Sequence, residues 1–364
     1  MRLLVASPEH DAVLRQLAAS TSMPGWIRLA YAREPDFFHA VGVQGSFNQV
    51  ILAMENDAAM GMGCRSIRPL YVNGRATAFG YLHGLRALPE ARRVGGLARG
   101  YHFLRDLHQD GRAPAYLTTI VEDNQAAHAL LTSGRAGLPT YRDCGRFLTY
   151  ALSLRRRRNS RSPAGVTITR ATAQSTDELI RFLETHGPRR QFFPCLAAKD
   201  FGTDLLRGLT PQDFLLAYNG AQLVGTLACW DQTAFKQNMV RGYTPRLALA
   251  RPLVNAALRL AGCTPLPPTG RQLHLIYAAF VCIANDDPQI LDALLERACA
   301  ECRPTGAHFL AIGFHETDPL RAAVTSFLKF TYASRLYLVH WDDGREFLAT
   351  LDPVRVPYLE LATL

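Results

Sequence analysis

The segment from residue 76 to residue 124 constrains the fold of this chain more than any other part of the sequence. An apolar stretch over 76–85 predicts a strand, which runs into a glycine-containing basic turn. Residues 96–108 carry apolar side chains at helical spacing, and 116–121 predict a second strand. A helix that connects two strands of one sheet makes those strands parallel neighbours. The segment therefore predicts a mixed sheet and an α/β (α+β) fold.

The turn that precedes the predicted helix has the composition of a phosphate-binding loop. Gly95 and Gly96 stand where the helix opens, and Arg92, Arg93 and Arg99 add positive charge. The first N–H groups of a helix have no intrahelical partner and lie at the positive end of the helix dipole, so they can hold a diphosphate. The turn has neither the Gly-Lys-Ser/Thr of a Walker loop nor a Gly-x-Gly-x-x-Gly fingerprint, so neither of those nucleotide sites is predicted.

The length of 364 residues indicates two domains, because single hydrophobic cores stop growing near about 250–300 residues. Four arginines beside serine and proline are typical of a solvated linker, so we predict domains over 1–154 and 166–364, joined by a linker over 155–165. The second part repeats the order of strands and helices of the first, which indicates a structural duplication. It carries Asp286 and Asp287 where the first part has its basic turn, and these carboxylates would repel a diphosphate.

Other features of the composition narrow the class of protein. No run of about eighteen apolar residues is present and the first apolar stretch is too short for a secretory signal, so we expect a cytoplasmic protein without a membrane span. Cys299 and Cys302 lie in a helical pattern without further ligands, so they are predicted to be structural thiols and no metal site is predicted. The net charge of +9 permits a nucleic-acid partner, but arginines of the turn and the linker account for much of it.

Two short motifs flank the predicted helix, one rich in arginine and glycine before it and one that begins with asparagine after the second strand. The first motif fits two overlapping registers, Arg92-x-x-Gly95 and Arg93-x-x-Gly96-x-Ala98. The second motif is Asn124-x-x-Ala127-x-x-Leu130. In this order they resemble the acyl-CoA-binding motifs of the GNAT superfamily of N-acyltransferases, over about residues 1–152. The resemblance implies two GNAT-like domains, each a mixed, largely antiparallel sheet flanked by helices, with a splayed central strand pair. The resemblance implies that the acyl-CoA lies between the two splayed strands of the first domain. The second domain is expected to be degenerate.

The resemblance also implies acetyl-CoA as the cosubstrate and assigns residues to it. These are Leu85, Ala87, Arg92, Arg93, Val94, Gly95, Gly96, Leu97, Ala98, Thr119, Asn124 and Ala127. An alternative for Asn124 is a helix N-cap without a ligand. The segment 25–38 combines aromatic and charged side chains, which suits either a wall of the acceptor pocket or a helix pair that covers one face of the sheet.

Acetyl transfer to an amine needs a base for the ammonium proton and an acid for the leaving thiolate. The usual base position of the family falls on His83, which shares a strand face with Tyr81 and titrates near neutral pH, although an ordinary strand histidine is an equal alternative. Glu55, at the end of a neighbouring strand, is the other candidate base. The family's usual acid is a tyrosine, but this chain has Leu131 there. Tyr141, in the loop that follows, is the candidate acid, unless none is needed.

These inferences predict an N-acetyltransferase that moves an acetyl group from acetyl-CoA to an amine by direct attack in a ternary complex. The acceptor is a small molecule, a peptide or a protein. Two alternatives remain: a non-catalytic acyl-CoA-binding or regulatory module, and an aminoacyl-tRNA-dependent peptidyltransferase, which also uses tandem GNAT-like halves. The phosphate turn in the first half favours acetyl-CoA over the tRNA-dependent reaction. The sequence defines neither the acceptor nor the oligomeric state.

Overall fold

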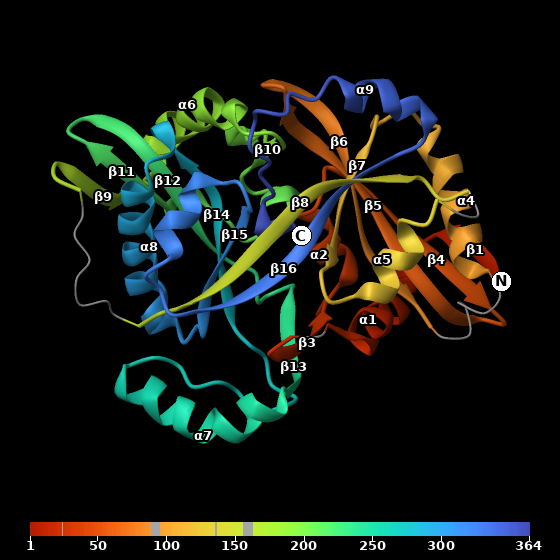
Figure 1. The fold of residues 1–364 in the computed structure, drawn as a ribbon, viewed down its shortest axis with the longest axis horizontal. Helices are drawn as coiled ribbons and strands as arrows, with labels where there is room; N and C mark the ends of the chain where they lie inside the picture. The colour runs from red at the N-terminus through yellow and green to blue at the C-terminus, as the bar shows by residue number, and fades with distance from the viewer. Residues whose placement is uncertain (24, 89–94, 135–136, 156–162) are drawn as a thin grey trace.

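One large mixed sheet passes through both halves of the chain. The computed structural model describes residues 1–364 apart from 24, 89–94, 135–136 and 156–162. Within the described residues the strands lie in the order β1-β4-β5-β6-β7-β16-β8-β15-β14-β12-β11-β9, and β10 also pairs with β5. Figure 1 shows the first half in red to yellow beside the second half in green to blue. The α/β fold class is confirmed, and the two expected sheets are joined into one.

The first half follows the predicted order of strand, turn, helix and strand around residues 76–124. Its elements are β1 (Arg2–Val5), α1 (Asp11–Ser20), β2 (Ser22–Met23), β3 (Ile27–Ala32), α2 (Phe37–Gly42), β4 (Phe47–Glu55), β5 (Ala58–Val72), β6 (Arg75–Ala87), α4 (Gly96–His108), β7 (Tyr116–Val121), α5 (Gln125–Leu131) and β8 (Thr140–Ser153). Asn73 and Gly74 form the tight turn between β5 and β6 with φ of 52° and 81°, values typical of a type I′ hairpin.

The second half repeats a hairpin and a parallel crossover. Its main elements are β9 (Val166–Arg170), α6 (Thr176–His186), β10 (Phe193–Pro194), β11 (Phe214–Asn219), β12 (Gln222–Asp231), β13 (Gln237–Tyr243), α7 (Pro245–Leu260), β14 (Leu275–Ile283), α8 (Pro288–Cys302), β15 (Phe309–His315), β16 (Lys329–His340) and α9 (Arg345–Ala349). Helix α8 makes the crossover from β14 to β15, as α4 does from β6 to β7.

Each half contains one pair of parallel strands that diverge. β6 and β7 pair only at Gly80–Tyr116 and Tyr81–Leu117, although β6 continues to Ala87. β14 and β15 likewise pair over only three positions, Leu275–Tyr277 with Phe309–Ala311. Beyond these contacts the strands separate and leave backbone groups without a strand partner. The predicted splayed central pair is therefore confirmed in both halves.

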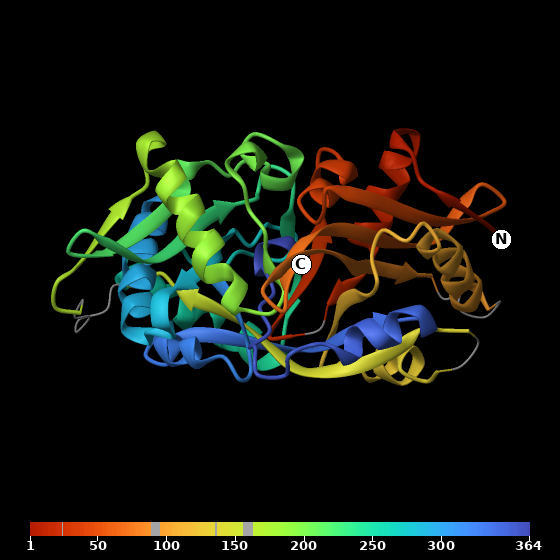
Figure 2. The same ribbon diagram turned by 90° about the horizontal axis from the view of Figure 1, so that it is seen from above.

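The last strand of each half crosses into the other half. β16 pairs with β7 along 334–339, and the C-terminal part of β8 pairs with β15. β8 and β16 also pair with each other along most of their length, and Figure 2 shows them side by side through the middle of the molecule. One expectation was wrong here, because Tyr141 lies in β8 and not in a loop. A short 3-10 helix (Pro319–Val324) precedes β16.

A second, small sheet also joins the two halves. Part of the segment 25–38, for which a helix pair was one alternative, forms β3, which pairs with β13 of the second half, so the sheet order is β13-β3-β2. The side chains of Ile27, Leu29 and Val240 are buried where these strands meet. The local pattern around residues 25–38 could not reveal this pairing, because its partner lies more than 200 residues away in sequence.

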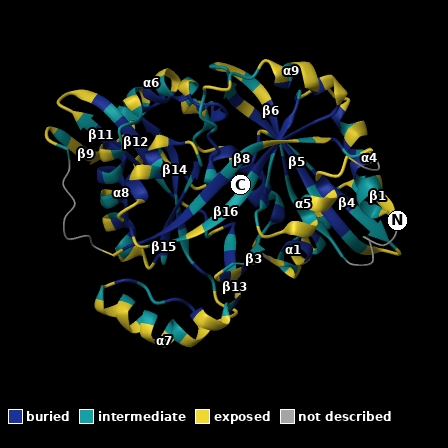
Figure 3. Cartoon of the chain, in the orientation of Figure 1, coloured by how far each residue is buried: buried dark blue, intermediate teal, exposed yellow. Residues whose placement is uncertain are grey.

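Helices cover both faces of the first half of the sheet. Val50 and Leu52 of β4 pack toward α1 and α2, whereas Ile51 packs toward α4, because successive side chains of a strand point to opposite faces. Helix α7 projects from the body of the molecule in Figure 1, and Figure 3 shows that much of its surface is exposed. None of the helices in the described ranges is long and apolar enough to span a membrane.

Candidate functional site

A cavity of about 450 Å³ lies in the gap between the diverging strands β6 and β7. Its wall takes residues from α4, α5 and β8 of the first half, and from β13, β14 and the C-terminal residues of the second. The second half therefore supplies part of the cavity wall. Most of the wall is apolar, and its polar side chains are concentrated near His83.

Most of the residues assigned to acetyl-CoA from the sequence lie around this cavity. Those in its wall are Leu85, Ala87, Gly96, Leu97, Thr119, Asn124 and Ala127. Gly95 and Ala98 adjoin them on α4 without lining the cavity. Arg92, Arg93 and Val94 fall outside the described residues. The Asn124 side chain accepts a hydrogen bond from the backbone of Ala127 at 3.2 Å, so it caps α5 as well as lining the cavity.

The first turn of α4 has the geometry of an anion site. Gly95 precedes the helix with φ of 70°, a left-handed conformation that favours glycine, and a Cβ atom built on it would meet nothing within 4 Å. Backbone N–H groups of the first helical turn face outward without intrahelical partners, at the positive end of the dipole. Open space, free N–H groups and the adjoining cavity together fit a diphosphate whose attached arm enters the gap between the strands.

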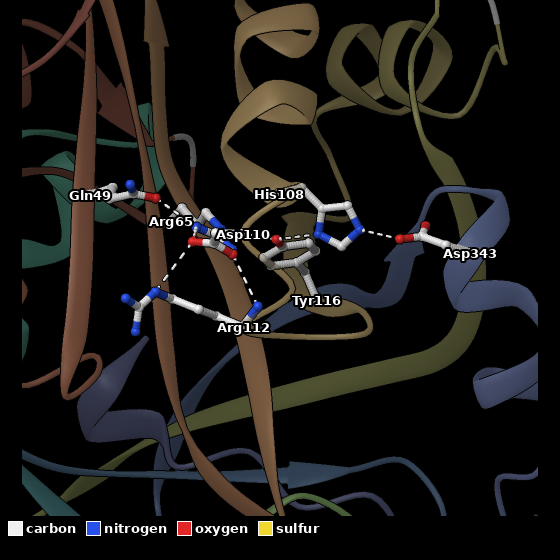
Figure 4. A network of polar contacts seen from close by, with 7 residues as sticks. All are labelled: Gln49, Arg65, His108, Asp110, Arg112, Tyr116 and Asp343. Atoms are coloured by element: carbon white, nitrogen blue, oxygen red, sulfur yellow. Dashed lines mark hydrogen bonds and ion pairs between the residues drawn. The ribbon is translucent and has the colours of Figure 1, made fainter.

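A polar network, drawn in Figure 4, fixes the point where β6 and β7 begin to diverge. The fully buried Arg65 of β5 donates two hydrogen bonds to Asp110, at 2.7 and 2.8 Å, and one to the hydroxyl of Tyr116 at 2.9 Å. Tyr116 also bonds Nδ1 of His108 at 2.8 Å. The Tyr116 ring lies so close to β6 that a Cβ atom on Gly80 would come within 2.0 Å of it. Tyr116 can therefore lie against β6 only because residue 80 is glycine.

A chain of hydrogen bonds orients the imidazole of His83. Asn48 donates its amide to the carbonyl oxygen of Gly45 at 2.7 Å and accepts from the Ser66 hydroxyl at 2.6 Å. Since that hydroxyl has only one proton to donate, Nε2 of His83, 2.8 Å from it, must be the donor. Nδ1 is then the nitrogen with the free lone pair. The ring also stacks on Tyr81 with centroids 4.7 Å apart, which fixes its plane.

The surroundings of His83 keep its imidazole neutral. Burial, and after it the charges of Arg33, Lys236 and Arg86, together lower the pKa of His83 to about 3. A neutral imidazole can accept a proton, but such a low pKa makes it a weak base. A bound anion that offsets these cations would raise the pKa toward the range of an effective base.

Tyr141 lies in the cavity wall, and so does Leu131, the residue at the family's usual tyrosine position. The hydroxyl groups of Tyr141 and Tyr101 form a short hydrogen bond with each other. Burial, and then the neighbouring Tyr101, raise the pKa of Tyr141 well above its usual value, so the phenol stays protonated. The structure thus places a proton donor in the cavity wall although the usual position holds leucine.

Glu55 lies apart from the cavity wall. Its carboxylate sits at the end of β4, about two-fifths exposed, and accepts a hydrogen bond from the amino group of Met1 at 3.3 Å. His83 is therefore the candidate base that the structure places in the cavity, and Glu55 is not.

Several polar residues of the cavity were missed by sequence reasoning. They are Tyr31 and Arg33 of the β3 segment and Lys236, Asn238 and Tyr277 of the second half. The mixture of aromatic and charged residues around 25–38 was a correct signal for Tyr31 and Arg33. The second-half residues gave no comparable signal, because they reach the cavity only through long-range pairing: β13 pairs with β3, and β14 pairs with β15, which in turn pairs with β8.

The second splayed pair differs at the place that corresponds to the phosphate turn. Asp286 accepts a hydrogen bond from Arg190 at 2.7 Å, and Arg190 also pairs with Asp318 at 2.9 Å. Asp287 caps α8 by accepting from the backbone of Gln289 at 2.8 Å. The groups at this helix terminus are thus already paired by residues of the chain.

Comparison with known proteins gives a structural likeness only. No protein-family model matches the sequence, and no curated protein matches it. The whole chain, 100% of it, is similar to a GCN5-related N-acetyltransferase from Sphaerobacter thermophilus, covering 98% of that chain with a TM-score of 0.57 and 14% identity. It is also similar to Saccharomyces cerevisiae N-myristoyltransferase with bound myristoyl-CoA, with 93% of this chain and 78% of that chain covered, a TM-score of 0.57 and 10% identity.

A third similar structure is a GCN5-related glucosamine N-acetyltransferase region of a fungal multi-domain GH3 β-N-acetylglucosaminidase. The likeness covers 93% of this chain and 38% of that one, with a TM-score of 0.58 and 12% identity. The chain therefore has the fold of the GNAT superfamily. The likeness to the first of these structures extends over the whole of this chain.

Proposed function

We propose that this protein is a GNAT-type N-acetyltransferase that transfers an acetyl group from acetyl-CoA to an amine. The observation that carries the proposal is the cavity of about 450 Å³ between β6 and β7. Its wall joins the first turn of α4, suited to a diphosphate, to His83 and Tyr141, suited to proton transfer. The proposed domain boundaries, 1–154 and 166–364, leave the coenzyme with the first part and let the second part complete the acceptor side.

In the proposed complex the diphosphate binds the N–H groups of Gly96, Leu97 and Ala98, aided by Arg92 and Arg93 of the preceding turn. The pantetheine arm follows the free edges of β6 and β7, beside Thr119 and Asn124. Free backbone groups on diverging strands support this placement, since they can pair with the amides of the arm. A paired Arg190–Asp286 cluster in the second half supports a single coenzyme site.

The proposed chemistry is direct attack within a ternary complex. The amine nitrogen attacks the thioester carbonyl carbon, so a C–N bond forms and the C–S bond breaks. Before the attack, Nδ1 of His83 takes one proton from the substrate ammonium and releases it to water. Tyr141 protonates the departing thiolate, and the second proton, which the nitrogen loses as the amide forms, returns through water to the Tyr141 phenolate. A thiolate is a good leaving group, so the donor contributes less than the correct placement of the two reactants.

The low pKa of His83 favours one alternative, a non-catalytic module that binds acyl-CoA. Acetyl-CoA binding and CoA release over a panel of amines separate these functions. Turnover with any amine supports the enzyme, and binding without turnover over the whole panel supports the module.

The binding site is tested by Gly95→Glu. A carboxylate at this position would share space with the diphosphate, and like charges in contact cost several kcal/mol, so acetyl-CoA should bind at least about 100-fold more weakly. Isothermal titration calorimetry measures this change.

Gly111→Glu is the matched control, because Gly111 follows α4 at the other end. Its φ is 66°, and a Cβ atom there also meets nothing within 4 Å. Both variants carry the same backbone strain and should lose similar thermal stability, yet Gly111→Glu should keep its acetyl-CoA affinity within about twofold. Equal affinities in the two variants would contradict the proposed diphosphate site.

A further inference from the structure

Three basic side chains line the acceptor side of the cavity, and no Asp or Glu side chain does so among the residues that the structure describes there. Arg33 directly follows β3, Arg86 lies near the end of β6, and Lys236 directly precedes β13. They thus belong to or adjoin three different strands, two from the first half and one from the second. Placing three like charges around one partly enclosed space is unfavourable unless an anion accompanies them.

Among the described residues, Arg33 and Arg86 each have few hydrogen-bond partners, so most of their N–H donors can bind a ligand. Arg33 donates one hydrogen bond, to the adjacent carbonyl oxygen of Ala32 at 2.9 Å, and Arg86 donates one to that of Leu85 at 2.9 Å. A guanidinium group has five N–H donors. Nε of Arg86 is buried and has no hydrogen-bond partner among the described residues. Such an unsatisfied charged donor is costly, and a bound carboxylate or phosphate would satisfy it.

Lys236 is already held by the chain, and burial, followed by the charge of Arg33, lowers its pKa well below the usual value, so it adds less charge than the arginines do. Its amino group donates to the carbonyl oxygen of Ala362 at 2.8 Å and to a main-chain oxygen of Leu364, the last residue of the sequence, at 3.3 Å. Glu360 is near enough to act on Lys236, but it lies outside the cavity wall and its carboxylate is occupied. Its donors are the backbone of Phe280 at 2.6 Å, the hydroxyl of Tyr358 at 2.8 Å and the backbone of Ala362 at 3.1 Å.

The cations act on the same place in the cavity. After burial, the three groups that lower the pKa of His83 are Arg33, Lys236 and Arg86. Arg33 and Arg86 also both act on Tyr31, whose phenol shares this wall. The positive field therefore converges on the position that the amine would occupy. A polycationic amine would be repelled there, whereas an amine with an anionic group would be attracted.

We infer that the acceptor is a small amine that also carries an anionic group, a carboxylate or a phosphate, bound by Arg33 and Arg86. This inference rests on the proposed function, because it names the substrate class of the same site. The anion pairs with the guanidinium groups, and the amine is thereby held near His83 and the thioester. Charge-assisted hydrogen bonds of this kind correspond to roughly 10- to 100-fold in affinity.

The test compares pairs of amines that differ only in the anionic group. Glycine, leucine and phenylalanine are each compared with their carboxamides, and ethanolamine phosphate is compared with ethanolamine, with rates expressed per unprotonated amine. The anionic member of at least one pair should have a kcat/KM higher by about 10- to 100-fold. The carboxylate and phosphate pairs identify which anion the site takes. Equal or better turnover of the neutral members in every pair would overturn the inference.

Variants of Arg33 test the site itself. Arg33→Met should remove the preference for the anionic amine, and Arg33→Lys should keep part of it. Arg28→Met is the matched control, because Arg28 lies on the same strand but is exposed and outside the cavity wall. The KM for acetyl-CoA should stay within about twofold in all three variants. If Arg33→Met weakens acetyl-CoA as much as the amine, the cations serve the coenzyme and the inference is wrong.

Failure of the proposed function would be recognised separately. If no amine is acetylated, calorimetry measures the affinity of the protein, saturated with CoA, for the two members of each pair. If acetyl-CoA does not bind, the same affinities are measured on the free protein. Tighter binding of the anionic members that is lost in Arg33→Met supports the inference. Equal binding of the two members overturns it, whatever the fate of the acetyltransferase proposal.

Discussion

His83 shows how neighbouring groups decide the chemistry of a single side chain. Its place on the strand before the glycine turn was predictable, and so was its shared face with Tyr81. The hydrogen bond to Ser66 and the cations around it were not, because they come from other strands. Together they assign the proton to Nε2 and hold the imidazole neutral. The residue predicted as a base titrating near neutral pH therefore has a much lower pKa in the folded protein.

The first prediction concerns the stability of the protein in acid. The pKa of His83 is about 3 in the folded protein and about 6.5 in the unfolded chain. Between these values only the unfolded chain takes up the proton, so stability is complete above pH 6.5 and falls as the pH drops toward 3. From pH 7 to pH 4.5, wild type should lose about 2.5 kcal/mol more than His83→Gln, at ~1.4 kcal/mol per pH unit below pH 6.5. Urea unfolding at both pH values measures the difference.

If both proteins lose the same free energy of unfolding between pH 7 and pH 4.5, His83 is already protonated in the folded protein at pH 4.5. For activity, His83→Gln should lower kcat by roughly 100-fold with unchanged acetyl-CoA affinity, because glutamine can donate to Ser66 but cannot accept the ammonium proton. A kcat that remained the same would remove His83 from the mechanism.

At the scale of elements, the gap between β6 and β7 depends on how its closed end is held. Strands that are parallel neighbours normally stay paired, yet here pairing stops after Gly80 and Tyr81. The network around Arg65 ties β5, β7 and the end of α4 together at that point, and His108 extends it to Asp343 at 2.9 Å (Figure 4). Removing this anchor should therefore weaken the whole first half.

Two arginines, Arg65 and Arg112, bind the carboxylate of Asp110 and allow this network to be tested. Arg65→Met removes a fully buried partner of Asp110 and leaves Tyr116 and Gln49 without their donor, so it should cost roughly 3 kcal/mol in the free energy of unfolding. Arg112→Met removes a mostly exposed partner 3.4 Å from Asp110 and should cost less than about 1 kcal/mol. Urea unfolding at pH 7 measures both. Similar values for the two variants would show that the buried network does not hold the gap.

At the scale of the whole molecule, the exchange of β8 and β16 makes the two halves interdependent. β16 fills the position between β7 and β8, so the first half cannot complete its sheet from its own strands. Leu336 and Leu338 of β16 are buried in a cluster with Phe79 and Leu117 of the first half. The predicted boundary at 154–166 thus separates the chain at a linker but does not separate two independent sheets.

The expected consequence is that residues 1–154 alone do not form a stable monomer. Without β16, an edge of β7 and an edge of β8 are open to pairing with other chains, and apolar surface is exposed. Circular dichroism and size-exclusion chromatography should show an unfolded or aggregated fragment. Co-expression of 1–154 with 166–364 as separate chains should restore a soluble complex, whereas a soluble 1–154 fragment with cooperative unfolding would contradict this dependence.

The sequence alone determined the local units of this protein. The strand, glycine turn, helix and strand of residues 76–124 and the hairpin turn at Asn73–Gly74 were predictable, because periodicity, glycine conformation and helix termini act over a few neighbouring residues. Most of the residues assigned to the coenzyme belong to that unit, and those that the structure describes line or adjoin the cavity.

Only the tertiary structure decided which strands exchange between the halves and what lines the acceptor side. β3 and β13 pair across more than 200 residues, and this pairing brings Arg33 and Lys236 into one cavity with His83 and Arg86. No local pattern encodes such a partnership, because strand pairing depends on which edges remain free once the rest of the sheet has formed. The gap between β6 and β7 therefore follows from sequence order, whereas the charge of the adjoining cavity follows from long-range packing.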